Sequence, residues 1–209
     1  MVQKVLIIDR RKGEFVDAVF HDDIKADQLN EAEAQWKPVR NDAIRHLLYA
    51  GKTKDEIHRL FQHAHWDWDR KAAPLLAGLL TIRCFGIEVS GQWQGLVMLD
   101  MAAHYAQLEP DRGKPLIYVE FLETAPWNLA DLVSEPRYGL VGTRLVEAAV
   151  QLSYSEGFRG RVGLFALPQA ERFYERCKMT RVEGAGRHGM AWYELTQKAA
   201  EVFLKGGQS

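Results

Sequence analysis

The stretch Arg137-Tyr138-Gly139-Leu140-Val141-Gly142-Thr143 is the most informative part of the sequence. It follows strand-type sequence and leads into a helical pattern, and its two glycines let the backbone turn tightly and approach a ligand. The N–H groups that begin a helix have no intrahelical acceptor and lie at the positive end of the helix dipole. The stretch therefore predicts a site for phosphate or pyrophosphate, although the turn alone would also explain both glycines.

Hydrophobic periodicity defines the elements around this stretch. Alternation at 84–89 and runs rich in β-forming residues elsewhere predict strands at 2–8, 84–89, 93–100, 116–123, 161–167, 180–183 and 190–196. Residues 15–20 fit either a strand or a helical turn. Helical spacing predicts helices at 142–156, 168–177 and 198–204, and the capping box Thr53-x-x-Glu56 begins another. The order β-β-β-α-β-α-β-β after residue 80 predicts a mixed sheet flanked by helices, an α/β (α+β) fold.

The N-terminal part is predicted to be partly helical. Asp27 or Asn30 is expected to cap a helix that Pro38 ends, because proline lacks the N–H of the next helical hydrogen bond. Asn41 is expected to cap a second helix, which ends at Gly51.

The composition is that of an ordinary globular protein. The 209 residues include 27 basic and 28 acidic side chains, so the net charge of −1 provides no field that would attract nucleic acid or an anionic membrane. The longest nearly apolar run, residues 74–82, is about half of a membrane-spanning helix. Cys84 and Cys177 are too few for a disulfide scaffold and are expected to be buried thiols. We expect one cytoplasmic domain over residues 1–209, with its core at 80–196 and a strand and helices before residue 75.

Two motifs carry a family resemblance. Arg137 and Gly142 fit the ends of an Arg/Gln-x-x-Gly-x-Gly/Ala loop, with Leu140 at the middle glycine, and Ala170-Glu171-Arg172-Phe173-Tyr174 matches Ala-x-x-Phe-Tyr. Together with the element order, these motifs resemble the GNAT superfamily of acyl-CoA-dependent N-acetyltransferases over roughly residues 80–196. The resemblance implies a GNAT-like central mixed sheet flanked by helices.

The resemblance also implies acetyl-CoA as the co-substrate, and no metal. The amides of residues 138–143 would hold the diphosphate of CoA, and Arg137 or Arg144 would neutralise a phosphate. The strand around Leu122, Glu123 and Thr124 would pair its backbone with the amides of the pantetheine arm. A bulge there would leave one N–H for the thioester oxygen, a donor worth roughly 3 kcal/mol in comparable sites.

The implied reaction is direct attack of a primary amine on the acetyl thioester. The amine must be neutral, so a base or an ordered water has to take its proton. Glu120 and Glu123 are both candidates, and their odd spacing points them to opposite faces of a regular strand; water remains a third option. Tyr174 occupies the position where the family often has a tyrosine that protonates the leaving thiolate, and a core aromatic is its other interpretation.

Two classes of function remain open at this stage. The first is the acetyltransferase, whose acceptor would be a small-molecule or peptide amine. The second is a non-catalytic module that binds CoA or a protein, because Leu140 and Leu167 replace a usual glycine and asparagine. The resemblance also leaves a homodimer open. The segment His63-Ala64-His65-Trp66-Asp67 has the spacing of a dinuclear metal site, but its helical context favours tryptophans that pack under a loop or line an acceptor pocket.

Overall fold

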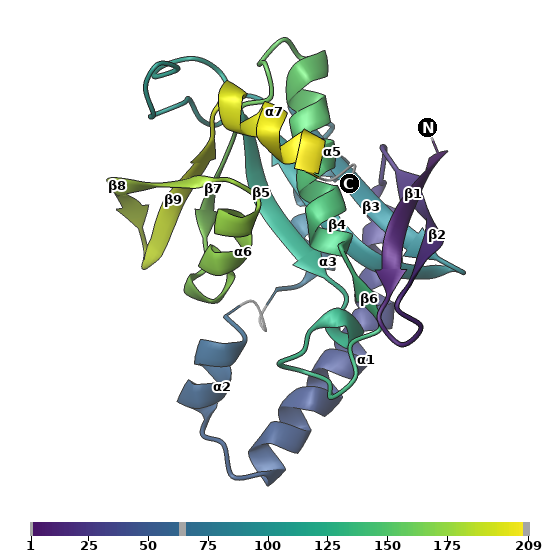
Figure 1. The fold of residues 1–209 in the computed structure, drawn as a ribbon. Coiled ribbons are helices and arrows are strands. Elements are labelled where there is room, and N and C mark those ends of the chain that lie inside the picture. The colour runs from purple at the N-terminus through teal and green to yellow at the C-terminus, as the bar shows by residue number, and fades with distance from the viewer. Residues whose placement is uncertain (1, 63–65, 207–209) are drawn as a thin grey trace. The chain divides into compact units, whose positions relative to one another are not determined.

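The computed structural model describes residues 2–62 and 66–206 (Figure 1). The chain divides into two compact units, Met1–Val97 with Leu122–Arg144 and Met98–Phe121 with Leu145–Ser209. Strands β4 (Gln92–Asp100) and β5 (Ile117–Thr124) and helix α5 (Val141–Ser155) continue from one unit into the other. The single domain expected from the sequence stays a prediction.

The first unit begins with a β-hairpin and a long helix. It contains β1 (Val2–Asp9), β2 (Glu14–His21), α1 (Ala26–Tyr49), α2 (Lys54–Leu60), α3 (Trp68–Lys71), α4 (Ala73–Leu76), β3 (Ile82–Val89) and the short β6 (Tyr138–Gly139). β1 pairs antiparallel with β2 along its whole length and with β6 at its end, and β2 pairs antiparallel with β3. Residues 15–20 therefore form a strand, and the predicted first strand is confirmed.

The prediction of two helices divided at Pro38 was wrong. Helix α1 is continuous from Ala26 to Tyr49, and its N-cap is Lys25 rather than Asp27, Asn30 or Asn41. A proline inside a helix costs about 3 kcal/mol, so packing must hold the helix together. Trp36 and Arg40 lie on either side of Pro38 and are both buried, and the Trp36 indole donates to the carbonyl of Trp93 over 2.8 Å. The capping box of Thr53 and Glu56 at the start of α2 is confirmed.

The second unit combines strands with two short helices. It contains β7 (Val162–Ala166), α6 (Glu171–Arg176), β8 (Thr180–Arg187), β9 (Met190–Leu195) and α7 (Gln197–Gly206), and a 3₁₀ turn at Pro168–Ala170 precedes α6. β5 runs parallel to β7, and β9 pairs antiparallel with β7 and with β8. The predicted strands and the terminal helix are confirmed, whereas the helix predicted over 168–177 begins as the 3₁₀ turn and is α-helical only over Glu171–Arg176.

The strand order β6-β1-β2-β3-β4-β5-β7-β9-β8 makes a mixed sheet of nine strands. This architecture confirms the predicted mixed α/β class.

One glycine is required for packing in the second unit. A Cβ on Gly163 of β7 would lie 2.5 Å from the ring of Trp192, closer than atoms can approach. Without that Cβ, Trp192 is fully buried and stacks with Tyr118 at a centroid distance of 6.0 Å and an interplanar angle of 7°. The aromatic core on this side of β5 and β7 thus depends on Gly163.

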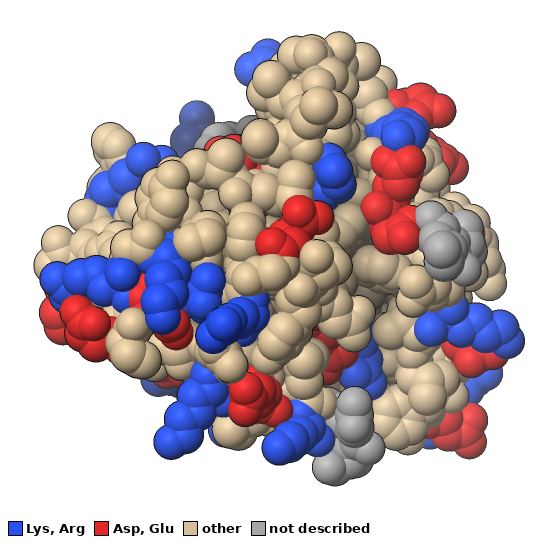
Figure 2. All heavy atoms as spheres, turned by 90° about the horizontal axis from the view of Figure 1, so that it is seen from above, with Lys and Arg blue, Asp and Glu red and all other residues tan. Residues whose placement is uncertain are grey.

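The surface carries charges of both signs. Basic and acidic side chains are interspersed over the face drawn in Figure 2, in keeping with the net charge of −1. No helix in the described part of the chain combines the length and apolar character needed to span a bilayer.

Candidate functional site

The parallel pairing between β5 and β7 ends before either strand does. Its register covers two residue pairs, Ile117–Val162 and Tyr118–Gly163, although β5 has eight residues and β7 has five. On its other edge, β7 pairs with β9 over all five residues, so the ladder is short only on the side of β5. Beyond these pairs the backbone groups of the two strands take no partner from this ladder, which is therefore open at this point.

The segment that leads into α5 adopts an unusual backbone. Leu140 has φ +67°, in the left-handed region that favours glycine and costs leucine about 1 kcal/mol. Helix α5 begins at the next residue, and Arg144 N–H donates to Leu140 C=O over 2.9 Å. Leu140 thus takes a glycine-like conformation at the position where the loop motif has its middle glycine. A left-handed residue followed by a helical one directs successive N–H groups to one side, as in anion-binding nests.

The charges around the start of α5 also favour the binding of an anion. Its first turn holds no acidic side chain, and Val141, Gly142 and Thr143 supply N–H groups that have no intrahelical acceptor. Arg144 Nε donates to the carbonyl of Leu6 on β1 over 2.9 Å. Arg137 is exposed and lies 5.4 Å from the ring centre of Trp127.

A buried polar network fixes the loop between β5 and α5. Asn128 Oδ1 accepts from the backbone N–H of Tyr138 over 3.0 Å, and Asn128 Nδ2 donates to Gln94 Oε1 over 3.2 Å. Trp127 Nε1 donates to the same Gln94 oxygen over 2.9 Å. Sequence reasoning missed these residues because Gln94 lies on β4, far along the chain from the loop. The available signal was the run Pro126-Trp127-Asn128 shortly after a strand.

Glu123 belongs to a buried cluster of charged and polar groups. Its Oε1 accepts from Arg40 Nη1 over 3.2 Å, and its Oε2 accepts from Trp68 Nε1 over 2.8 Å. Arg40 also donates to Glu33, whose second oxygen accepts the backbone N–H of Trp68 over 3.2 Å. All four residues are at most 4% exposed. The cluster joins α1 and α3 to the end of β5, and two carboxylates share one guanidinium.

The two carboxylates predicted as bases have different environments. Burial is the main cause that raises the pKa of Glu123 to about 7, while the charge of Arg40 opposes that rise. Glu120 is exposed. The expectation that the two side chains would differ in orientation therefore agrees with their burial. Leu122 and Thr124, predicted to contact the coenzyme, are both half-buried on the same strand.

Tyr174 lies on α6 in the second unit and is buried. Its ring packs against Phe173 at 5.0 Å and Tyr193 at 6.4 Å between centroids. Burial raises the pKa of the Tyr174 phenol, so the group is protonated at neutral pH. The protonated phenol is the form that a proton donor to a thiolate needs.

Within the described ranges, the two cysteines and the predicted metal-type spacing add no group to the candidate site. Cys84 and Cys177 are buried thiols, as expected, and burial raises the pKa of both. His63, Ala64 and His65 lie outside the described residues. Among the residues that are described, no group of three or more His, Cys, Asp or Glu could hold a metal ion.

Comparison with known proteins gives a clear result for the fold. No family model and no curated protein match the sequence. The structure is similar to PaiA N-acetyltransferase from Thermoplasma acidophilum in complex with coenzyme A, with 12% identity over 86% of this chain and 98% of that chain and a TM-score of 0.53. It is also similar to the GNAT domain of S. lividans PAT, with 12% identity over 91% and 95% of the chains and a TM-score of 0.55. The chain has the GNAT fold.

A third similar structure is that of a bacterial toxin. It has 10% identity to this GNAT-fold chain, covers 98% of this chain and 96% of the toxin, and has a TM-score of 0.53. Identities this low leave the reaction of the present chain to be argued from its own residues.

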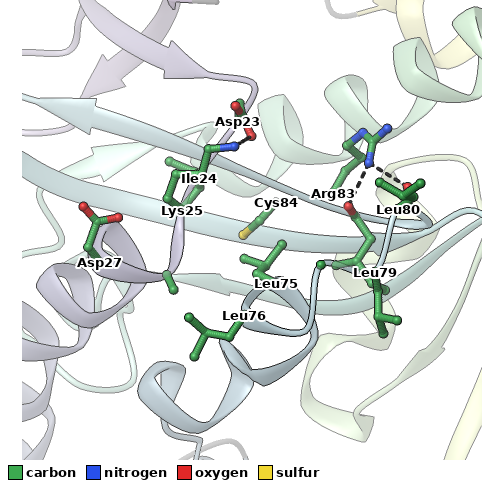
Figure 3. A pocket seen from close by; sticks show the side chains of 13 residues that line it. Asp23, Ile24, Lys25, Asp27, Leu75, Leu76, Leu79, Leu80, Arg83 and Cys84 are labelled. Carbon is green, nitrogen blue, oxygen red and sulfur yellow. Dashed lines mark hydrogen bonds and ion pairs between the residues drawn. The ribbon is translucent and has the colours of Figure 1, made fainter.

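A separate hollow of about 600 Å³ lies in the first unit of this GNAT fold. Figure 3 shows Leu75, Leu76, Leu79 and Leu80 on one side of it and Cys84 behind, with the Asp23–Lys25 ion pair across the opening. Leu76 and Leu80 are 74% and 82% exposed. None of the residues predicted for catalysis or coenzyme binding lines this hollow.

Proposed function

We propose that the protein is an acetyl-CoA-dependent N-acetyltransferase that transfers the acetyl group to a primary amine. The observation that carries this proposal is the early end of the pairing between β5 and β7 in a chain with the GNAT fold. A pantetheine arm has amide groups that can hydrogen-bond to a strand that has left its neighbour. The similar PaiA structure contains coenzyme A, which supports the same ligand here.

The coenzyme fits the segment before α5 in this proposal. N–H groups from Tyr138 to Thr143 would hold the diphosphate, and Arg137 or Arg144 would neutralise part of its charge. Leu122 and Thr124 would flank the pantetheine arm. Acetyl-CoA supplies an activated thioester carbonyl, and an N–H from β5 would stabilise the charge that develops on its oxygen.

The attacking amine has to lose a proton, and Glu123 is our first candidate to accept it. A base works best when its pKa lies near the working pH, and the pKa of Glu123 is raised to about 7. Because both of its oxygens already accept hydrogen bonds from Arg40 and Trp68, an ordered water would relay the proton. Glu120 is the alternative, as an exposed carboxylate on the same strand.

Tyr174 is our candidate for the proton donor to the leaving thiolate. The thiol of CoA has a pKa near ~8.5 by analogy with cysteine, so protonation eases its departure. Burial keeps the Tyr174 phenol protonated and makes it a weaker acid, so it would assist by donating a hydrogen bond to the thiolate as the thiolate leaves. The products would be free CoA and the acetamide of the acceptor, which would be a small-molecule or peptide amine.

The second candidate function is a GNAT-fold module that binds CoA or a protein without turnover. The observation in its favour is that both oxygens of Glu123 are engaged inside the protein. In this alternative, Glu123 holds α1 and α3 to the sheet and takes no part in chemistry.

Thermal unfolding with acetyl-CoA, followed by an activity assay on a panel of amines, tests the proposal. Ligand at 100 times its Kd should add about 2.7 kcal/mol of stability, which raises Tm by about 5–11 °C in a protein of this size. CoA release with an amine present, measured with a thiol reagent, would support the transferase. A Tm shift without turnover on any amine would favour the binding module, and no shift would contradict both CoA-dependent functions.

A further inference from the structure

The turn between β1 and β2 carries three consecutive basic residues, Arg10, Arg11 and Lys12, and all three are exposed. The turn itself is ordered by Asp9, whose Oδ1 accepts the backbone N–H groups of Arg11 and Lys12 over 3.0 and 3.3 Å. The carboxylate is therefore used to shape the turn, and the three cationic side chains project from a defined backbone.

Pairing of β1 with β6 brings this turn to the segment that precedes α5. The register joins Ile8 to Gly139 and Asp9 to Tyr138, and Arg10 N–H donates to Arg137 C=O over 2.8 Å. A Cβ on Gly139 would lie 3.2 Å from Arg10 Nε. The side chain of Arg10 thus lies against Gly139, one residue before Leu140.

The local charge is positive although the whole chain is not. Residues 9–14 and 135–144 together hold five basic side chains, namely the three of the turn, Arg137 and Arg144. The same residues include three acids, Asp9, Glu14 and Glu135. The local charge is therefore 5 − 3 = +2, in a chain of net charge −1. Glu135 Oε2 lies 3.5 Å from Arg11 Nη2 in an exposed pair, which contributes little. The excess positive charge thus sits beside the proposed diphosphate site.

We propose that Arg10, with Arg11 and Lys12, binds the 3′-phosphate of the coenzyme. This inference rests on the proposed function, since it places the second phosphate group of CoA next to the diphosphate at residues 138–143. A phosphomonoester offers three acceptor oxygens and up to two charges, and a guanidinium can bind two of those oxygens at once. One ribose separates the two phosphate groups of CoA, and the side chain of Arg10 lies against Gly139 at the edge of the diphosphate segment.

Isothermal titration with CoA and with 3′-dephospho-CoA tests the inference. The wild-type protein should bind CoA about tenfold more tightly than 3′-dephospho-CoA, as expected for one or two charge-assisted hydrogen bonds. Arg10→Gln should weaken CoA binding about tenfold and change 3′-dephospho-CoA binding less than about twofold. Lys4→Gln is the matched control, because Lys4 is an exposed cation of the same hairpin, paired with Asp17, and should leave both affinities unchanged.

Two outcomes would overturn the inference and leave the proposed function standing. Equal binding of the two nucleotides by the wild-type protein would exclude recognition of the 3′-phosphate, and equal weakening of both by Arg10→Gln would assign Arg10 to the diphosphate. Failure of the wild-type protein to bind either form of CoA would instead overturn the proposed function together with this inference.

Discussion

Replacing Glu123 by glutamine is expected to remove the contribution of one titrating carboxyl group to the pH dependence of the free energy of unfolding. In the folded protein, burial raises the pKa of Glu123 from 4.5 to about 7. The unfolded chain therefore loses this proton at lower pH than the folded protein does. Between the two pKa values the folded state binds more protons, so its free energy of unfolding falls as the pH rises.

The size of this effect follows from the difference of the two pKa values. A change of about 2.5 pH units at about 1.4 kcal/mol per unit gives a loss of roughly 3 kcal/mol from pH 4.5 to pH 7. The stabilisation is fully present below pH 4.5 and is lost above pH 7. Glutamine keeps the shape of the side chain and carries no titratable proton, so this part of the curve should disappear in Glu123→Gln.

Urea unfolding at a series of pH values from about 4 to about 8 measures the effect as the difference between variant and wild type. Glu120→Gln is the matched control, because Glu120 is an exposed carboxylate on the same strand, and its curve should follow that of the wild type. If Glu123→Gln and wild type show the same slope between pH 4.5 and 7, Glu123 titrates like an ordinary carboxyl, and its role as a base with a raised pKa is refuted.

Three further substitutions test other parts of the structure. Tyr174→Phe should lower kcat roughly 10²-fold if Tyr174 protonates the thiolate. Tyr154 is an exposed tyrosine of the same unit, so Tyr154→Phe should leave kcat unchanged and serves as the control. An unchanged kcat in Tyr174→Phe would remove Tyr174 from the mechanism. Asn128→Ala should lower the free energy of unfolding in urea by about 1–3 kcal/mol, because it removes buried hydrogen bonds from the loop before α5. It should also weaken CoA binding, and an unaltered affinity for CoA would show that this loop does not position the coenzyme. Gly163→Ala should lower the free energy of unfolding by about 1–3 kcal/mol, because its Cβ would lie 2.5 Å from the ring of Trp192. Unchanged stability in urea would show that the sheet can adjust to the added carbon.

The fold was predictable where the sequence is locally periodic. The alternation in residues 84–89 predicted strand β3 to within two residues at each end. The helical spacing after Gly142 predicted helix α5 to within one residue at each end. Pro38 misled the prediction, because the local cost of a proline is outweighed by the buried Trp36 and Arg40, whose partners come from distant strands. A strand as short as β6 has no periodicity that a sequence could reveal.

The candidate site was predictable only in part. The resemblance pointed to residues 137–143 and to Tyr174, but no pattern predicts that Glu123 shares Arg40 with Glu33, because 83 residues separate Arg40 from Glu123. The left-handed φ of Leu140 could not be read from the sequence either, since leucine rarely adopts it. Both features depend on tertiary structure.

The short ladder between β1 and β6 has a practical consequence for anyone who shortens or tags this protein. Ile8 and Asp9 are the neighbours that hold Gly139 and Tyr138 in place, so a variant that begins after residue 13 would lose the outer support of the loop ahead of α5. Its sheet could still form from the later strands. In such a truncated protein, weaker binding of CoA would reflect the deletion and would say little about the chain that keeps β1.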